Sequence, residues 1–288
     1  MSLNFRNQIV KNGDVNISVN VRGSGEPLLL IHGYPETHLT WHKIVPELAQ
    51  RYTVVCPDVR GNGDSDKPVG APDHSNYSKR ALASDMIAIM DELGFETFKV
   101  VGHDRGARIT HRLCLDYPSR VTKAVLLDII PTRTLYETVN QNVATAYFHW
   151  FFLIQKAPIP ETLIGGNPLS YLHWGLSARI GGVEAVDPVA LAAFEKNILD
   201  PEVIHATCED YRAGATIDLE HDKADSDVRV ECPLLVIWGN LGPMGKYYDV
   251  LSTWQDKALD VQGFGLECGH YISQEKPAEL LAALEEFL

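Results

Sequence analysis

Short apolar runs that alternate with amphipathic stretches restrict the fold of this 288-residue chain more than any other feature of its sequence. The runs have the length of strands and lie at 27–32, 52–56, 98–102, 121–127 and 233–238. Such runs are typical of strands that are buried on both faces of a sheet. Helical periods separate several of them, at 41–50, 79–93 and 105–117. The alternation predicts βαβ units, and therefore an α/β fold with a mostly parallel central sheet flanked by helices.

Two departures from this alternation organise the rest of the chain. Turn residues at 12–14 separate two β-rich runs within 8–21, which predicts a hairpin near the N-terminus. After Pro131 the strand runs stop; they resume at Glu231, and the chain closes with a helical period at 277–288. We therefore predict a core made of 1–133 and 226–288, with 134–225 inserted as a helical cap. Ligands of open α/β sheets bind beyond the carboxyl ends of the strands, so this cap would cover the active site.

Charge excludes several classes of partner. The formal net charge is −13, from 25 Lys and Arg against 38 Asp and Glu, and such a surface repels nucleic acid and anionic lipid.

No apolar run is long enough to span a membrane, and the first residues lack the apolar stretch of a signal peptide. The five cysteines are scattered without a CxxC pair, which favours free thiols in a cytoplasmic protein without a zinc site. We expect neither a metal nor a cofactor.

The segment Gly102-His103-Asp104-Arg105-Gly106 lies between a predicted strand and a predicted helix. A nucleophile that is flanked by glycines in this position is typical of a nucleophile elbow. Here the central residue is Asp104, and the first amides of the following helix favour an ionised carboxylate. The alternative interpretation is an aspartate that only caps the helix.

Three further segments have the order and spacing found in α/β hydrolases, which the chain resembles over essentially its whole length. The loop at 32–35 contains Gly33 and Tyr34, and the resemblance implies that it supplies an oxyanion site. A glycine-rich turn follows at 57–65. His270 precedes the last helix, where the resemblance places the general base. A lone histidine is more often structural, but this ordered set favours a catalytic His270.

The acid that would orient His270 is Asp128, at the carboxyl end of the strand 121–127. Many α/β hydrolases place this acid after a later strand, but the corresponding loop here, 240–244, contains no carboxylate. Asp249 comes only later, on a predicted helix. The alternative role of Asp128 is a loop hydrogen bond at the end of its strand.

An aspartate nucleophile narrows the chemistry. A carboxylate is ionised at neutral pH and needs no base for attack on an sp³ carbon. It displaces a halide or opens an epoxide, and a histidine base then activates water to hydrolyse the resulting ester. The set of Asp104, His270 and Asp128 therefore leaves dehalogenase and epoxide hydrolase as alternatives.

Arg105 and Arg108 favour the dehalogenase, because two arginines beside the nucleophile suit a substrate that carries a carboxylate. An arginine fork binds a carboxylate through two parallel hydrogen bonds. This arrangement would also let a strongly acidic protein accept a small anionic substrate. In the alternative interpretation, both arginines pair with acidic side chains on a solvated helix face.

With these residues in place, the chain resembles the fluoroacetate dehalogenase (haloacetate dehalogenase) family. The resemblance rests on 102–108, Asp128 and His270, and extends to 147–150 and 210–212 in the predicted cap. It implies that Arg105 and Arg108 hold the substrate carboxylate. It also implies that the halide is bound by three hydrogen-bond donors, His149, Trp150 and Tyr211. Without the resemblance, 149 and 150 would be taken as packing residues. The family commonly has Phe where this chain has Tyr34. The resemblance also suggests that the protein is a homodimer.

We therefore predict a hydrolase acting on carbon–halide bonds, which converts short 2-haloacids such as fluoroacetate and chloroacetate to 2-hydroxy acids such as glycolate. The reaction would pass through an ester of Asp104. The first alternative is an epoxide hydrolase with the same nucleophile and base, in which cap tyrosines protonate the epoxide; the candidates are Tyr147, Tyr171 and Tyr211. A second alternative is a non-catalytic ligand-binding protein, since a fold does not fix a function.

Overall fold

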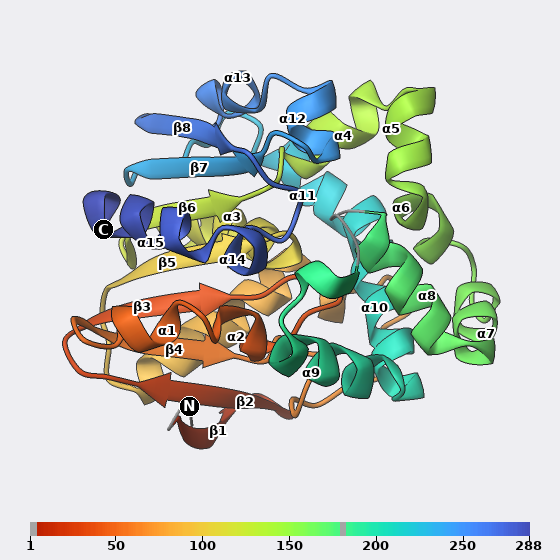
Figure 1. The fold of residues 1–288 in the computed structure, drawn as a ribbon, viewed down its shortest axis with the longest axis horizontal. Helices are drawn as coiled ribbons and strands as arrows, with labels where there is room; N and C mark the ends of the chain where they lie inside the picture. The colour runs from red at the N-terminus through yellow and green to blue at the C-terminus, as the bar shows by residue number, and fades with distance from the viewer. Residues whose placement is uncertain (1–4, 179–182) are drawn as a thin grey trace.

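A computed structural model describes residues 5–178 and 183–288 of the chain. Its centre is an eight-stranded sheet in the order β1-β2-β4-β3-β5-β6-β7-β8 (Figure 1). The N-terminal hairpin predicted from the turn at 12–14 is present as β1 (Arg6–Asn12) and β2 (Val15–Arg22), paired antiparallel. Strand β2 also pairs antiparallel with β4. Every pairing that follows β4 in this order is parallel, as the sequence predicts. These strands are β3 (Glu26–Ile31), β4 (Tyr52–Pro57), β5 (Phe98–His103), β6 (Val121–Leu127), β7 (Leu234–Gly239) and β8 (Val261–Leu266).

Helices cover both faces of the sheet, because alternate residues of its strands are apolar on both sides. In β3, Leu29 and Ile31 pack in the core beneath α2 (Lys79–Glu92) and α3 (Arg105–Asp116). Leu28 and Leu30 point to the other face and pack with α1 (Val45–Leu48) and α15 (Pro277–Phe287). This two-residue period is the geometry of a strand buried on both sides. Shorter elements complete the core: η1 (His38–Trp41), η2 (Ser75–Tyr77), α12 (Pro243–Tyr247), α13 (Val250–Gln255) and α14 (Ile272–Glu275).

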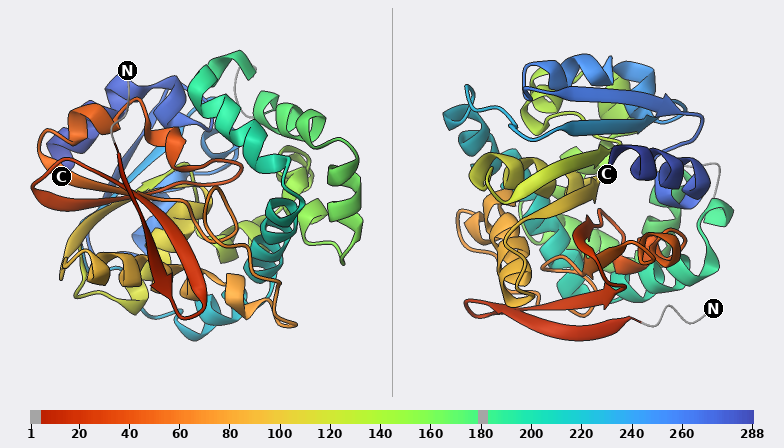
Figure 2. Two further views of the ribbon diagram at one scale, coloured as in Figure 1. Left: turned by 90° about the horizontal axis from the view of Figure 1, so that it is seen from below. Right: turned by 90° about the vertical axis from the view of Figure 1, so that its left-hand side faces the viewer.

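Between β6 and β7 the described chain is helical and contains no strand. Its elements are α4 (Thr132–Thr138), α5 (Gln141–Ala146), α6 (Phe148–Leu153), α7 (Ile159–Gly166), α8 (Pro168–Ser177), η3 (Val183–Ala185), α9 (Pro188–Ile198), α10 (Pro201–Ala215) and α11 (Ile217–Ala224). Most of them lie beyond the carboxyl ends of the parallel strands, and the left view of Figure 2 shows the green helices at that same end (Figures 1 and 2). The start of the predicted insertion, residue 134, falls inside α4.

Two expectations about secondary structure need correction. The helical period at 41–50 does not form one helix, because Pro46 lacks the N–H that a continuous helix would bond to the carbonyl of His42. The chain instead forms η1 and then α1, in which Pro46 occupies the first turn. Strand β8 was not among the predicted apolar runs: its exposed positions alternate with half-buried ones, so it lacks the apolar signature of the inner strands.

Candidate active site

Asp104 occupies the turn between β5 and α3 in a strained conformation, with φ 47° and ψ −115°. A positive φ is costly for a residue with a side chain. Close approach of neighbouring backbone explains the adjacent glycines: a Cβ on Gly33 would lie 2.6 Å from the Cβ of Asp104, and one on Gly106 would collide with the carbonyls of Ile31 and His32. Within the described residues the Asp104 side chain makes no capping hydrogen bond to α3, so the helix-cap interpretation does not describe it.

The three residues predicted to carry the chemistry lie together at the carboxyl edge of the sheet. The Nδ1 atom of His270 is 2.6 Å from Oδ2 of Asp128, and its Nε2 atom is 4.0 Å from Oδ1 of Asp104. The other Asp128 oxygen accepts a hydrogen bond of 2.9 Å from the amide of Gly239. Asp128 also has a positive φ, 53°. Its carboxylate thus fixes the ring of His270 so that the opposite nitrogen faces Asp104.

The loop at 32–35 also contacts Asp104. The backbone N–H of Tyr34 donates to Oδ2 of Asp104 at 3.1 Å. Burial alone would raise the pKa of Asp104, but His270, His103 and the two arginines together lower it well below its usual range. Asp104 is therefore an ionised, buried carboxylate with Oδ1 on the side of His270 and Oδ2 held by the amide of Tyr34.

Arg105 and Arg108 are both buried beside Asp104, but their partners differ. Arg105 forms an ion pair through Nε with the side chain of Asp210 on α10, and its Nη2 donates to the Asp210 carbonyl at 2.7 Å. Arg108 forms no salt bridge within the described ranges; its Nη1 donates to Ile130 O and Thr132 Oγ1 at 3.0 and 2.9 Å. The alternative in which both arginines pair with acids on a solvated face holds only in part: Arg105 has an acidic partner, and neither residue is solvated.

Arg108 also keeps unused hydrogen-bonding capacity. Its buried Nε atom has no hydrogen-bond partner among the described residues. Burial, followed by repulsion from Arg105, lowers the pKa of Arg108. Burial also acts to lower the pKa of Arg105, but the charges of Asp210, Tyr211 and Asp104 together raise it. The site therefore contains one arginine matched by a carboxylate and one bound only by neutral oxygens.

The predicted halide donors form an aromatic cluster over the arginines. The ring of Tyr211 lies 5.7 Å from His149 and 5.8 Å from Trp150, measured between centroids. The guanidinium of Arg105 stacks 4.2 Å from the Tyr211 ring, and that of Arg108 lies 4.5 Å from the Trp150 ring. The buried indole N–H of Trp150 has no hydrogen-bond partner in the part of the chain that the structure describes. Tyr34 completes the cluster, stacked on His149 at 6.4 Å.

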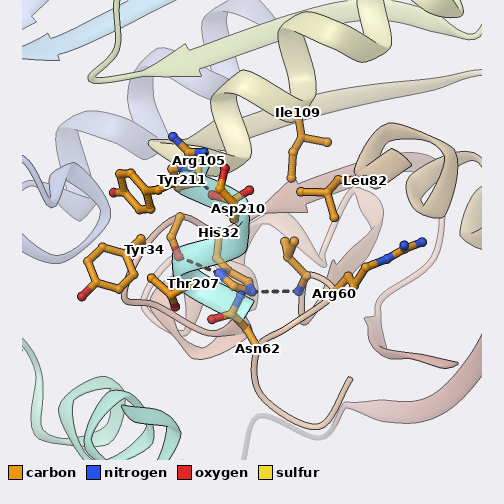
Figure 3. Close-up of a pocket in the computed structure, with 12 residues that line it drawn as sticks. His32, Tyr34, Arg60, Asn62, Leu82, Arg105, Ile109, Thr207, Asp210 and Tyr211 are labelled. Atoms are coloured by element: carbon orange, nitrogen blue, oxygen red, sulfur yellow. Dashed lines mark hydrogen bonds and ion pairs between the residues drawn. The ribbon is translucent and has the colours of Figure 1, made fainter. Parts of the chain in front are cut away.

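A small cavity of about 20 Å³ lies beside this cluster and is lined in part by Tyr34, Arg105, Asp210 and Tyr211 (Figure 3). That space holds about one water molecule. Figure 3 shows Arg105, Asp210 and Tyr211 grouped on one side of it. Asp104 is not among its lining residues, so the cavity adjoins the nucleophile rather than containing it.

Several residues at the site were not predicted as site residues. Asp210 carries no local motif of its own; its position next to Tyr211 was the only signal available in the sequence. Thr132 follows Pro131, where the strand pattern ends, and nothing in the sequence singles it out as a partner of Arg108. Both contacts depend on how the helices after β6 pack against α3, which a residue pattern does not encode.

No cluster of His, Cys, Asp or Glu suited to a metal ion occurs in residues 5–178 and 183–288. None of the helices in those ranges combines the length and apolarity that a membrane span requires. All five cysteines lie within the described ranges as free thiols that form no disulfide. The Sγ atoms of Cys114 and Cys232 are 3.9 Å apart.

Comparison with known proteins places this geometry in a family. A family model described as alpha/beta hydrolase fold matches residues 26–277. The chain is 45% identical to a fluoroacetate dehalogenase from Burkholderia sp., over 99% of this chain and 94% of that protein. This chain belongs to the haloacetate dehalogenase family of the α/β hydrolases. The family resemblance predicted from the motifs is thereby confirmed, and the protein is a hydrolase.

Two further relatives frame the family. A putative α/β hydrolase from Nostoc sp. PCC 7120 is 53% identical, with a TM-score of 0.98 over 100% of this chain and 99% of that one. A soluble epoxide hydrolase from Corynebacterium sp. (strain C12) is 30% identical over 88% of this chain and 87% of that protein. Epoxide hydrolases are therefore similar to this member of the dehalogenase family.

Proposed function

We propose that this hydrolase converts short 2-haloacids to 2-hydroxy acids and halide, with Asp104 as the nucleophile. The observation that carries the proposal is a buried, ionised carboxylate beside Arg108, a buried guanidinium that forms no salt bridge with any described carboxylate. A charge in this state favours an anionic ligand strongly, because the surroundings are poorly solvated. The identity to a fluoroacetate dehalogenase supports the same substrate class.

In the first step, Oδ1 of Asp104 attacks the carbon that carries the halogen. A C–O bond forms, the carbon–halogen bond breaks, and the halide leaves with the electron pair. The substrate carboxylate binds Arg108 and the remaining donors of Arg105. His149, Trp150 and Tyr211 donate to the departing halide; their N–H and O–H groups stabilise the charge as it develops.

In the second step, His270 removes a proton from water, and the hydroxide adds to the carbonyl carbon of the Asp104 ester. Asp128 orients His270 and stabilises its protonated form through the 2.6 Å contact. The negative charge of the tetrahedral intermediate falls on Oδ2, which accepts the Tyr34 N–H. Collapse of the intermediate breaks the bond between the Asp104 carbonyl carbon and the alkoxide oxygen. The alkoxide takes the proton of the new Asp104 carboxyl group and leaves as glycolate, and His270 returns its proton to solvent. Asp104 is again ionised and holds one oxygen atom from water.

We also propose that the helices of 134–225 act as a cap over this site, because they supply the halide donors and Asp210 while the core supplies the nucleophile, base and arginines. The ring of Tyr34 stacks on His149 and carries a hydroxyl group that a phenylalanine in this position would lack.

The experiment that tests the proposal is halide release from fluoroacetate and chloroacetate, measured side by side with ion-selective electrodes. Release of both ions supports the proposed reaction and a halide site that serves the poorest leaving group. Release of chloride alone restricts the proposal to weaker carbon–halogen bonds. Release of neither halide would contradict it.

An epoxide hydrolase is the second candidate, favoured by the 30% identity to a soluble epoxide hydrolase and by two cap tyrosines, Tyr147 and Tyr211, both buried close to His149. Such tyrosines would protonate the oxygen of an opening epoxide. Hydrolysis of styrene oxide or an epoxy acid, without halide release from haloacetates, would favour this candidate.

A further inference from the structure

His103, the residue before the nucleophile, makes contacts that the proposed mechanism does not use. It is 1% exposed, and both of its ring nitrogens have partners. Its Nδ1 atom lies 2.7 Å from Oε2 of Glu36, and its Nε2 atom lies 2.8 Å from the backbone carbonyl of His270. A carboxylate and a carbonyl are both acceptors, so each bond requires an N–H on the histidine. A neutral imidazole has only one, and the geometry therefore calls for an imidazolium.

Glu36 has the matching environment of an ionised carboxylate. It is completely buried, and its neighbours are donors: the Gly33 N–H reaches Oε2 at 2.8 Å and the Thr40 hydroxyl reaches Oε1 at 2.6 Å. Burial alone would lower the pKa of His103, but the charge and hydrogen bond of Glu36 raise it to about 9. Burial would raise the pKa of Glu36, and His103 lowers it instead.

We propose that His103 is a positioning residue, protonated at neutral pH, which forms a buried ion pair with Glu36 and adds a positive charge beside His270, the proposed base. The pair joins three parts of the site. Glu36 holds the amide of Gly33, next to the Tyr34 amide that contacts Asp104. His103 donates a hydrogen bond through Nε2 to the backbone carbonyl of His270.

The electrostatic part of this role follows from the charges that face His270. Two carboxylates approach its ring, Asp128 at 2.6 Å and Asp104 at 4.0 Å, and both attract positive charge. A protonated His270 cannot accept a proton from water. The protonated His103 ring, 4.7 Å away between centroids, adds a positive charge that opposes the two carboxylates. Besides Glu36 and His270, the ionisable side chains that face His103 are Asp104 and Tyr271, whose ring lies 5.9 Å away.

The inference deepens the proposed function and rests on it for the role of His270 as base, but its first test needs no substrate. The first test is NMR of the ring nitrogens of ¹⁵N-histidine-labelled protein between pH 6 and 8. His103 is expected to show two imidazolium-type nitrogens throughout this range. One protonated and one unprotonated nitrogen at neutral pH would overturn the proposal.

The second test removes the whole pair with the double variant Glu36→Gln/His103→Asn, since removal of one partner alone would leave a buried, unpaired charge. The acid limb of the pH profile of chloroacetate hydrolysis is expected to move to higher pH by at least about half a unit, a threefold change in rate on that limb. The matched control is His173→Asn/Glu195→Gln, which removes a partly exposed His–Glu pair of the same 2.7 Å length. It should leave the pH profile unchanged.

A purely structural role for His103 predicts a different result: the double variant would lose stability while the pH profile of hydrolysis stayed in place, and this outcome would overturn the electrostatic proposal. The tests also separate the inference from the proposed function. A charged His103 in a protein that releases no halide would leave the inference standing for another substrate. A neutral His103 in an active dehalogenase would remove the inference alone.

Discussion

At the scale of single residues, the proposed mechanism assigns the first step to Asp104 and the second to His270, and variants of these residues should separate the two steps. Asp104→Asn should abolish halide release, because an amide is a poor nucleophile. His270→Ala should release one equivalent of halide and then stop, since the base is needed only for hydrolysis of the ester. Intact-protein mass spectrometry after incubation with chloroacetate should show an increase of one carboxymethyl group on the His270 variant. Normal turnover by that variant would contradict the assignment; His173→Ala, on the surface of α8, is the control.

The two arginines should differ in their contribution to substrate binding. Arg108 is bound by neutral oxygens, whereas the charge of Arg105 is matched by Asp210. Arg108→Leu should therefore lower kcat/KM for chloroacetate by about 100-fold, the loss of a charge-assisted bond of roughly 2–3 kcal/mol. Arg108→Lys should lose less, since it keeps the charge but not the fork. Equal effects of Arg105→Leu and Arg108→Leu in steady-state kinetics would show that Asp210 does not distinguish them.

The residues that could be predicted from the sequence are those fixed by local turns. Asp104 is predictable because the glycines on either side report the crowding of the elbow, and Asp128 because it ends a clear apolar strand. The partner of Arg105 was not predictable, since Asp210 lies more than a hundred residues further along and reaches it only through the packing of α10. The state of His103 was equally hidden, because it depends on Glu36 and on the carbonyl of His270.

At the scale of elements, a chain of charges fastens α10 and α11 to the core. Lys79, at the start of α2, forms ion pairs with Asp210 on α10 and Asp218 on α11, and Asp210 is shared with Arg105 on α3. Lys79 is buried, and burial is the main cause that lowers its pKa. Buried charges of this kind are costly when one partner is lost. The network thus couples the position of α10 to the orientation of Arg105.

Asp210→Asn should accordingly raise KM for chloroacetate by about tenfold or more while kcat changes little, since Arg105 loses its orientation but Asp104 and His270 do not. A matched control is Asp225→Asn, which removes an ion pair of 2.6 Å between Arg112 on α3 and the end of α11, away from the site. Steady-state kinetics of both variants give the comparison. The same rise in KM for the control would mean that general loosening of the helices, and not Arg105, is responsible.

Elements were predictable to different degrees for the same physical reason. Strands buried on both faces, such as β5 and β6, are short and contain continuous apolar runs, so they stand out in the sequence. Strand β8 has half-buried and exposed positions and does not. The interval 41–50 has a helical period, but Pro46 interrupts it, which a period alone does not reveal. The packing of the helices between β6 and β7 is tertiary information throughout.

At the scale of the whole molecule, the buried His103–Glu36 pair makes stability depend on pH. The folded pKa of His103 is raised from 6.5 to about 9, so the folded state binds this proton more tightly than the unfolded chain does. The stabilisation is therefore complete below pH 6.5 and is lost as the pH rises through 9. A shift of this size corresponds to at most about 3 kcal/mol. The lowered pKa of Glu36 acts at the other end, where its contribution disappears only in acid.

Urea denaturation at intervals between pH 6 and 9.5 should thus show the free energy of unfolding falling with pH for the native protein. Other groups, such as Lys79, also titrate differently in the folded state, so the native curve alone does not isolate the pair. The variant Glu36→Gln/His103→Asn lacks both charges, and its curve should fall less steeply over the same range by up to the same 3 kcal/mol, roughly. The control His173→Asn/Glu195→Gln should run parallel to the native protein. If the unfolding free energy of the Glu36/His103 variant fell with pH as steeply as that of the native protein, His103 would carry no extra proton in the folded state. Its ring would then be a neutral imidazole in contact with the His270 carbonyl.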